Sequence, residues 1–572
     1  MAEQDIVMTP SKVGKATHIK IERKKKSLVQ QSSVEHVAGG QHAGLVINKA
    51  AEGDEENNEQ SHLQISFNCF LVDQKNGGHV VERRRLRFWY VDGTDYLDQV
   101  TTAYEFFKEL VKPDNFPRDY VGFIKKCMKQ MQRADYLQAR KINLEIQQLD
   151  DEEAPLSPGL NKEDIRPKEE IVREKLLHVL ESAYPNIMAV EDLVRITTAD
   201  EIMVTEQLAE LKHRDLVRTM ENGGVVRHVL DEKTEVQMVK QMPTIAANQQ
   251  PTIAIITGNY CEKLAVDSMM ESKTTFVRFK TEGESNVYTV GYIGEHKVVS
   301  TKLPTMGHYR AAQISAGNTT TRLLGTFQNI EHVFVVGVAG GVPHYTDYYK
   351  HVRLGDIVVS MCHDNSPVYI NCEKILQDRD GKITYNIKSW GPREFILQNI
   401  CSRLRDIQQT RPEYAPWERY VAEGLELLKN QEADYNRPAK SSDRLYMDVG
   451  DNNVIEVQHP ECPEGFRGIR AGVPNVHFGV IGAGRSVMKS DTTRLDFANR
   501  NGIIAYDGQF DQVLESIVGN RKDSFLFIRG IADYHDGSRI KDWQPYASLV
   551  AAGYMKAIIK SISNPHLSED ED

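Results

Sequence analysis

One aspartate stands where an α/β protein presents a catalytic acid. Asp533 ends the apolar run that begins at Phe527, and polar residues then lead into the alanine-rich segment WQPYASLVAAGYMKAII. A buried strand that stops at an acid and turns into a helix places that acid at the ligand-binding edge of an open sheet. We therefore expect Asp533 to take part in chemistry. The alternative is an aspartate that only caps the following helix.

A second candidate is a run of small residues. Gly337, Ala339, Gly340 and Gly341 close the apolar stretch HVFVVGVAGG. Missing side chains allow a ligand to lie against the backbone, and the same residues also fit a tight turn without a ligand. We expect a ligand to contact this segment.

The chain that carries these residues has 572 residues, too many for one hydrophobic core, so we expect several domains. Its net charge of -11 argues against nonspecific binding to polyanions. The 7 cysteines are scattered without CxxC spacing, which predicts neither a disulfide framework nor a zinc site. No apolar run is long enough to span a bilayer, and the first residues are not signal-like. We expect a cytoplasmic protein without a metal or cofactor.

The first 150 residues fall into two regions. Residues 1–61 are polar with short apolar islands, and we predict a disordered arm. Within it, the basic cluster Arg23–Lys26 is either a nuclear import signal or a solvated group, so a nuclear location is an alternative. Residues 62–149 combine a hairpin around Asn76–Gly78 with two helical segments, which predicts a small α+β domain.

Residues 166–232 show three helical segments followed by the strand-turn-strand pattern RTMENGGVVRHVL, and they resemble a winged-helix domain. Winged helices that bind DNA need cations toward the phosphates. Residues 166–230 carry 9 Lys and Arg against 12 Asp and Glu, and the third helix is acidic. The charge favours docking to proteins over binding to DNA.

Residues 251–562 alternate apolar strands with helices, which predicts one α/β domain with a sheet covered on both faces, and residues 563–572 form an acidic tail. The blocks IAIITGNYCEKLAV, LPTMGHYRAA, GVAGGVP, VHFGVIGAGRSVMK, AYDGQF and RGIADYHD, in this order, resemble the purine and uridine phosphorylase superfamily, closest to its nucleosidase-like branch. The resemblance implies a mixed central sheet, a nucleoside or nucleotide ligand and a homo-oligomer.

The resemblance also implies catalytic roles. Glu262 matches the glutamate with which nucleosidases orient and deprotonate water, although acids also favour helix starts for other reasons. Asp533 matches the general acid that protonates the leaving purine. Phosphorylases add a hydroxyl residue and arginines for phosphate, but Val338 and Ala339 offer no hydroxyl and TGNYCEKL has no arginine. Hydrolysis is therefore favoured over phosphorolysis, which remains an alternative.

The sugar and base contacts follow from the same resemblance. Asp507 keeps the first of two acids, while Gly508 and Gln509 replace a methionine and the second acid that grips the ribose. Glutamine accepts a hydrogen bond but lacks the charge that stabilises a cationic sugar. Val487 and Met488 match positions that line the base, or are plain core. Arg485 stands near the sugar and would suit a 5′-phosphate.

Two functions remain open from the sequence. The first is a purine-type nucleosidase with Asp533 as acid and Glu262 orienting water. The second is a catalytically silent nucleoside-binding or scaffold protein, which the change at Gln509 favours. Both include protein partners for the winged-helix and N-terminal domains, and in the second function DNA is an alternative partner of the winged helix.

Overall fold

The computed structural model describes residues 4–562 apart from 27–33, 41–42, 51–58, 73–78, 118, 150–166, 229–234, 240–241, 243–248, 279–285, 305–309, 362–365, 379–381, 412–413, 451–452 and 464–471. The expected turn at Asn76–Gly78 and the acidic tail lie outside these residues. The chain forms two compact units. The first contains Met1–Glu163, Pro343–His351 and Ser441–Phe466, and the second contains Asp164–Val342, Val352–Lys440 and Arg467–Asp572.

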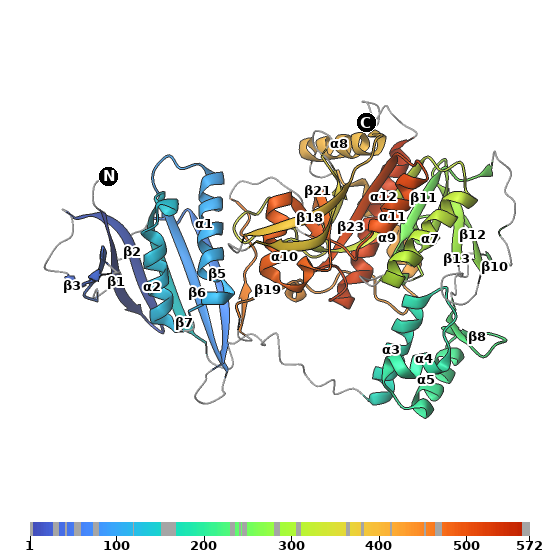
Figure 1. Ribbon diagram of the computed structural model, residues 1–572, viewed down its shortest axis with the longest axis horizontal. Helices are drawn as coiled ribbons and strands as arrows, with labels where there is room; N and C mark the ends of the chain where they lie inside the picture. The colour runs from blue at the N-terminus through green and yellow to red at the C-terminus, as the bar shows by residue number, and fades with distance from the viewer. Residues whose placement is uncertain are drawn as a thin grey trace. The chain divides into compact units, whose positions relative to one another are not determined.

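The first unit is built on one sheet of nine strands in the described residues (Figure 1), in the order β19-β20-β5-β6-β7-β2-β1-β4-β3. Neighbouring strands run antiparallel except β1 and β4, which are parallel. The strands are β1 (Gln4–Val13), β2 (Ala16–Lys25), β3 (Val34–Val37), β4 (Leu45–Asn48), β5 (Leu63–Val72), β6 (His79–Tyr90), β7 (Ala139–Gln148), β19 (Leu445–Asp448) and β20 (Val454–Val457).

Two helices, α1 (Tyr96–Leu110) and α2 (Tyr120–Met131), complete the core of this unit. Each begins after an aspartate whose side chain accepts a hydrogen bond from a first-turn N–H, which satisfies one of the unpaired donors of a helix start. Phe106 and Phe107 of α1 are fully buried. Their rings meet Phe88 and Phe67 of the sheet at centroid distances of 5.6 and 5.3 Å.

The prediction that residues 1–61 form a disordered arm is wrong. β1 and β2 pair along their whole length, from Gln4 opposite Lys25 to Val13 opposite Ala16. Ile19 and Ile21 are at most 2% exposed, so the strand alternates inward apolar and outward polar residues. The prediction relied on the high mean polarity of residues 1–61, which does not reveal the alternation of apolar and polar residues within each strand. Arg23 of the basic cluster belongs to β2.

The prediction that residues 251–562 form one continuous domain is also wrong. Pro343–His351 and Ser441–Phe466 lie within that range but belong to the first unit. β20 joins the first sheet by pairing with β5, with Val454 opposite Phe70. The pairing has no local signature in the sequence, because its two partners are far apart along the chain.

The second unit has the mixed sheet that the sequence predicted. This sheet has twelve strands in the described residues. Eleven of them follow the order β10-β12-β13-β14-β11-β15-β23-β16-β21-β17-β18, and the twelfth, β22, pairs with β15 and β21. The strands are β10 (Glu235–Met238), β11 (Ile253–Thr257), β12 (Glu271–Arg278), β13 (Asn286–Ile293), β14 (His296–Lys302), β15 (His332–Gly341), β16 (Ile357–Ser360), β17 (Tyr369–Gln377), β18 (Ile383–Trp390), β21 (Val476–Ala483), β22 (Ile503–Tyr506) and β23 (Ser524–Asp533).

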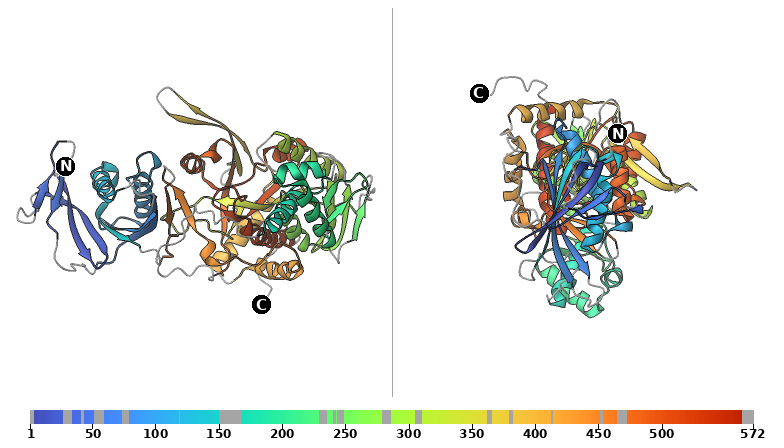
Figure 2. Two further views of the ribbon diagram at one scale, coloured as in Figure 1. Left: turned by 90° about the horizontal axis from the view of Figure 1, so that it is seen from below. Right: turned by 90° about the vertical axis from the view of Figure 1, so that its left-hand side faces the viewer.

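β22 closes part of this sheet into a ring. Tyr506 lies opposite Gly340 of β15 and Gly482 of β21, so β15, β23, β16, β21 and β22 follow one another around a closed path. The hairpin of β17 and β18 projects away from the sheet (Figure 2). The helices are α6 (Tyr260–Ser268), α7 (Arg310–Thr326), α8 (Ile396–Thr410), α9 (Pro416–Leu428), α10 (Asp491–Asn501), α11 (Asp511–Gly519) and α12 (Gln544–Ile562).

The second unit also contains three helices and a short hairpin: α3 (Lys168–Ala183), α4 (Val190–Thr197), α5 (Glu201–His213), β8 (Val217–Thr219) and β9 (Val225–Arg227). Leu176 and Leu180 lie one helical turn apart on α3 and pack with Leu193, Val204 and Leu211. All five are at most 1% exposed. The three helices therefore enclose their own small core.

Candidate functional site

Glu262 lies in the first turn of α6, directly after β11. Its Oε2 accepts hydrogen bonds from the backbone N–H groups of Gly258 at 2.6 Å and Asn259 at 2.9 Å, and its Oε1 accepts one from Val338 at 2.8 Å. The side chain is 3% exposed. Because a helix leaves its first N–H groups unpaired, Glu262 caps α6 and also ties that helix to β15.

Asp533 is the last residue of β23 and is 1% exposed. Its Oδ1 accepts hydrogen bonds from the N–H groups of His535 and Gly537, both at 2.8 Å, and its Oδ2 accepts one from Arg539 at 2.7 Å. In this structure Asp533 therefore organises the turn 534–539.

The two carboxylates flank the same stretch of β15. β11, β15 and β23 are adjacent parallel strands, so their carboxyl ends meet at one edge of the sheet. Val338 donates to Glu262 on one side, and Gly340 pairs with Asp533 on the other. The structure thus brings together the two residues that the sequence predicted to be catalytic.

The backbone around Ala339, Gly340 and Gly341 contacts the chain itself. A Cβ at Gly337 would lie 2.4 Å from the carboxyl carbon of Glu262, and one at Gly340 would lie 2.2 Å from the backbone carbon of His535. Only glycine fits so close an approach. The surface that was expected to receive a nucleoside is therefore covered here by the turn that Asp533 holds.

Asp507 is fully buried and pairs with the equally buried Arg529 at 2.8 Å. Its other oxygen accepts hydrogen bonds from the hydroxyl of Tyr369 at 2.6 Å and from the N–H of Gln509 at 3.2 Å. Burial raises the pKa of Asp507, and the Arg529 guanidinium opposes that shift. Gln509 adopts a φ of 75°, in the left-handed region. The structure gives Asp507 a role in packing.

The predicted base-lining pair lies in an apolar cluster. Val487 is fully buried and Met488 is 8% exposed, and both pack with Phe497 and Tyr506. Arg485 is exposed two residues before them. The pair is linked to the Asp533 turn, because the carbonyl oxygen of Met488 lies 3.1 Å from Nε2 of His535.

Three side chains that organise this edge were not singled out from the sequence: Tyr369, Arg529 and His535. Arg529 offered a signal, because a charged residue inside the apolar run FLFIRGIAD must find a buried partner. Tyr369 and His535 offered none, since their partners come from distant segments. The guanidinium of Arg529 also stacks on Phe510, 4.2 Å from the ring centroid.

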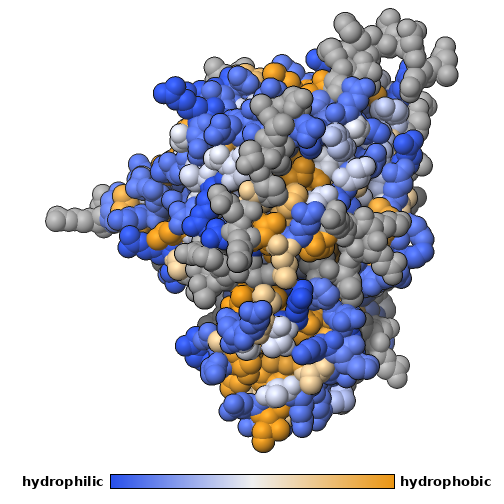
Figure 3. Space-filling view, turned by 90° about the vertical axis from the view of Figure 1, so that its right-hand side faces the viewer, coloured by the Kyte–Doolittle hydropathy of each residue, from blue (hydrophilic) through white to orange (hydrophobic). Residues whose placement is uncertain are grey.

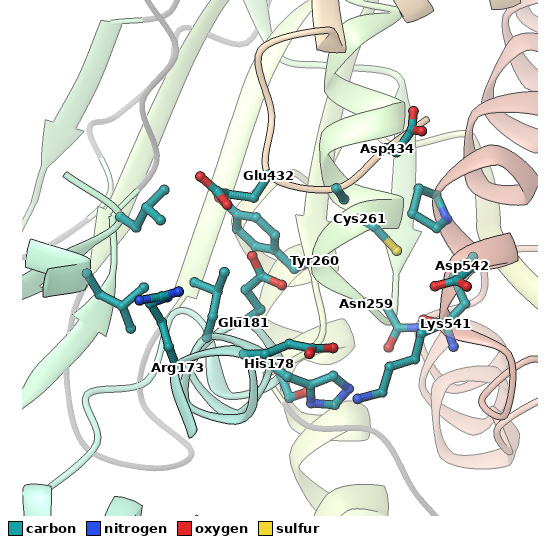
Figure 4. A pocket seen from close by; sticks show the side chains of 18 of the residues that line it. Arg173, His178, Glu181, Asn259, Tyr260, Cys261, Glu432, Asp434, Lys541 and Asp542 are labelled. Carbon is teal, nitrogen blue, oxygen red and sulfur yellow. The ribbon is translucent and has the colours of Figure 1, made fainter. Parts of the chain in front are cut away.

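A pocket of about 820 Å³ lies beside this edge (Figure 4). Its walls are α3, the start of α6, the segment 432–438 and the segment 538–545. Burial and the nearby Lys541 ammonium lower the pKa of His178 on the α3 wall. Burial raises the pKa of Glu181 on the same wall, against the effect of Arg227. The pocket therefore holds both acidic and basic groups.

Within the described ranges, no three His, Cys, Asp or Glu side chains are grouped as ligands of a metal ion. In the same ranges, no helix combines the length and the apolar character that crossing a membrane requires.

Residues 162–229 match the family model of the winged helix-turn-helix domain. This segment is a winged helix. The match agrees with the winged helix that the sequence predicted at 166–232. Within the matched range the structure has the three helices α3, α4 and α5 and the short hairpin of β8 and β9.

Several solved structures are similar to about half of the chain. A 5′-methylthioadenosine/S-adenosylhomocysteine nucleosidase from Neisseria meningitidis is 15% identical, with 54% of this chain and 99% of that chain covered and a TM-score of 0.32. The futalosine hydrolase of Helicobacter pylori is 12% identical, with 55% and 99% covered and a TM-score of 0.33.

A curated relative is a nucleotide-binding leucine-rich repeat (NLR)-like protein of Hyaloscypha variabilis. It is 29% identical over 319 residues, which are 55% of this chain and 30% of the relative. The chain thus spans less than a third of the length of the relative that it matches.

Proposed function

We propose that the second unit hydrolyses the N-glycosidic bond of a purine-type nucleoside or nucleotide. The observation that carries this proposal is the placement of Glu262 and Asp533, two buried carboxylates on either side of one stretch of β15. Breaking such a bond requires a proton for the leaving base and an activated water for the sugar, and two carboxylates can supply both.

In this mechanism Asp533 gives its proton to the purine, which leaves as a neutral base. Glu262 accepts a proton from the water whose oxygen forms the new bond to the anomeric carbon. Asp533 can protonate a base only when one of its oxygens gives up its hydrogen bond to a backbone N–H and contacts the purine instead. The turn 534–539 therefore has to move away from Ala339–Gly341 when substrate binds.

The test is release of free base from adenosine, inosine, methylthioadenosine, AMP and ATP, with and without phosphate. We expect release without phosphate, and a fall of about 10²- to 10⁴-fold in kcat for Asp533→Asn and for Glu262→Gln. Asp536→Asn is the matched control, because Asp536 bonds Ser538 within the same turn. No release from any substrate by the wild type would refute the proposal, and release only with phosphate would indicate a phosphorylase.

A silent nucleoside-binding protein is the second candidate, and the environment of Asp507 favours it. Arg529 and Tyr369 occupy the oxygens of Asp507, and Gln509 replaces the acid that would grip a ribose. Thermal stabilisation by a nucleoside without base release would support this candidate. Gln509→Glu restores the missing charge, so a gain of activity in that variant would show that the sugar contact limits catalysis.

We also propose that the winged helix docks to a protein partner. Ile196 and Ile202 are 50% and 69% exposed on α4 and α5, and apolar surface gathers over this region in Figure 3. Glu201 and Glu206 share the exposed side of α5 with Ile202. Protein docking would be contradicted if the whole chain shifted duplex DNA in electrophoresis and if Ile202→Ala weakened that shift. Glu201→Ala, which removes a charge that repels DNA, would then strengthen it. No shift by the wild type is the expected result.

A further inference from the structure

Lys302 at the end of β14 is a buried lysine that joins two parts of the second unit. It is 1% exposed, and its ammonium group donates three hydrogen bonds of 2.9 Å, to the carbonyl oxygens of Ser182, Tyr184 and Leu303. Ser182 and Tyr184 lie at the end of α3, where a helix leaves carbonyl groups unpaired. A cation at this end also complements the helix dipole. Lys302 therefore fastens the winged helix to the α/β body.

Aromatic and charged contacts reinforce this attachment. The ring of Tyr184 meets that of Tyr260 edge to face, at a centroid distance of 5.6 Å. Arg227 of the wing lies over the ring of Tyr260, with its guanidinium carbon 5.0 Å from the ring centroid. Its Nε also pairs with Glu181 of α3 at 3.1 Å. Tyr184 and Tyr260 are at most 6% exposed. The contact between the winged helix and Tyr260 is thus closely packed.

Tyr260 is the first residue of α6, and Glu262 is the third. The capping box in this turn holds the Glu262 carboxylate with the N–H groups of Gly258 and Asn259. A shift of Tyr260 by a fraction of an ångström therefore moves the group that must orient water. The winged helix also forms one wall of the pocket, where Glu181 of α3 lies with Asn259 and Tyr260 of this turn (Figure 4).

We propose that the docked winged helix is a positioning element for Glu262. It acts through the hydrogen bonds of Lys302 to the end of α3 and through the contact of Tyr184 with Tyr260. The proposal rests on the function proposed above. It implies that a partner that draws the winged helix away also changes the catalytic turn.

The test uses Tyr184, which lies in the winged helix and touches no reacting atom. Tyr184→Leu keeps an apolar side chain but removes the ring contact, and Tyr184→Phe is the matched variant that keeps the ring. We expect Tyr184→Leu to lower kcat by about 10- to 100-fold at nearly unchanged KM, because misplacing a reacting group by about 1 Å has effects of this size. Tyr184→Phe should match the wild type.

Hydrogen exchange separates this proposal from the activity itself. In Tyr184→Leu we expect faster exchange at Gly258, Asn259 and Val338, whose N–H groups bond Glu262, and unchanged exchange in β23. Unchanged exchange at these three amides would overturn the proposal. Faster exchange together with a wild type that releases no base would support the coupling and refute only the nucleosidase function.

Lys302→Met is the second variant, in case Tyr184→Leu also loosens β23 and so reports general unfolding. It should give the same local change at the three amides. If a variant detaches α3 from the α/β body but exchange at the three amides stays slow, the winged helix does not position Glu262 and the proposal is overturned.

Discussion

At the scale of single residues, the candidate site is dominated by buried charges with fixed partners. Asp507 and Arg529 are both fully buried, and two nitrogens of Arg529, Nε and Nη1, have no hydrogen-bond partner among the described residues. Removing two charges from water is costly, and their attraction offsets that cost only while both are present. The pair therefore constrains β22 and β23 without adding much net stability.

Arg529→Met should lower the free energy of unfolding of the second unit by about 3–5 kcal/mol, because it leaves Asp507 buried without its cation. The double variant Arg529→Met with Asp507→Asn should recover a large part of this loss. Urea unfolding followed by tryptophan fluorescence measures both values. Equal losses in the single and the double variant would show that the guanidinium contributes through its packing on Phe510 instead.

At the scale of elements, the first unit depends on strands that lie far apart in the sequence. β20 covers the outer edge of β5, and Ile455 in its middle is fully buried. An uncovered edge strand exposes N–H and C=O groups to pairing with other chains. The segment Ser441–Phe466 is thus part of the first unit in energetic terms as well.

Ile455→Ala should destabilise the first unit by about 2–5 kcal/mol, the usual range for a buried isoleucine. Hydrogen exchange should speed up in β5 and stay unchanged in β23. Val454→Ala, at a half-buried neighbour, is the control and should cost less. Faster exchange in β23 than in β5 would place the segment in the second unit.

The sequence predicted elements whose signals are local. The strand that ends at Asp533, the helix that starts near Glu262 and the winged helix all follow from short patterns of apolar, glycine and capping residues. It failed where partners are distant. The pairing of β20 with β5, the cover over Gly340 and the carbonyl partners of Lys302 each join segments that no local pattern relates. The strands β1 and β2 were missed because a polar average outweighed their alternation.

At the scale of the whole molecule, the winged helix and the α/β body share one compact unit, and a buried lysine, Lys302, lies where they meet. Burial lowers the pKa of Lys302 to about 7, and Glu262, Glu181 and Cys261 oppose this shift. In the folded second unit Lys302 therefore loses its proton near neutral pH. In the unfolded chain Lys302 keeps that proton up to the ordinary pKa of a lysine. Its stability is coupled to pH in this range.

The sign of this coupling is testable with Lys302→Met. Between about pH 7 and 10 the unfolded chain binds the proton of Lys302 and the folded chain does not, so the stability of the wild type relative to the variant rises with pH. The slope is at most about 1.4 kcal/mol per pH unit, and it vanishes below pH 7. Unfolding in urea at several pH values measures it. A difference that stays constant from pH 7 to 10 would show that Lys302 remains protonated.

The interleaving of the two units has a consequence for synthesis on the ribosome. Asn68 of β5 bonds Glu456 of β20, and 388 residues separate them. At about 5–20 residues per second, the ribosome synthesises β20 on the order of 20–80 s after it has synthesised β5. During that time the edge of β5 lacks its partner strand β20, while most of the second unit is being translated. A nascent chain would therefore need this edge shielded until the last strands of its sheet arrive.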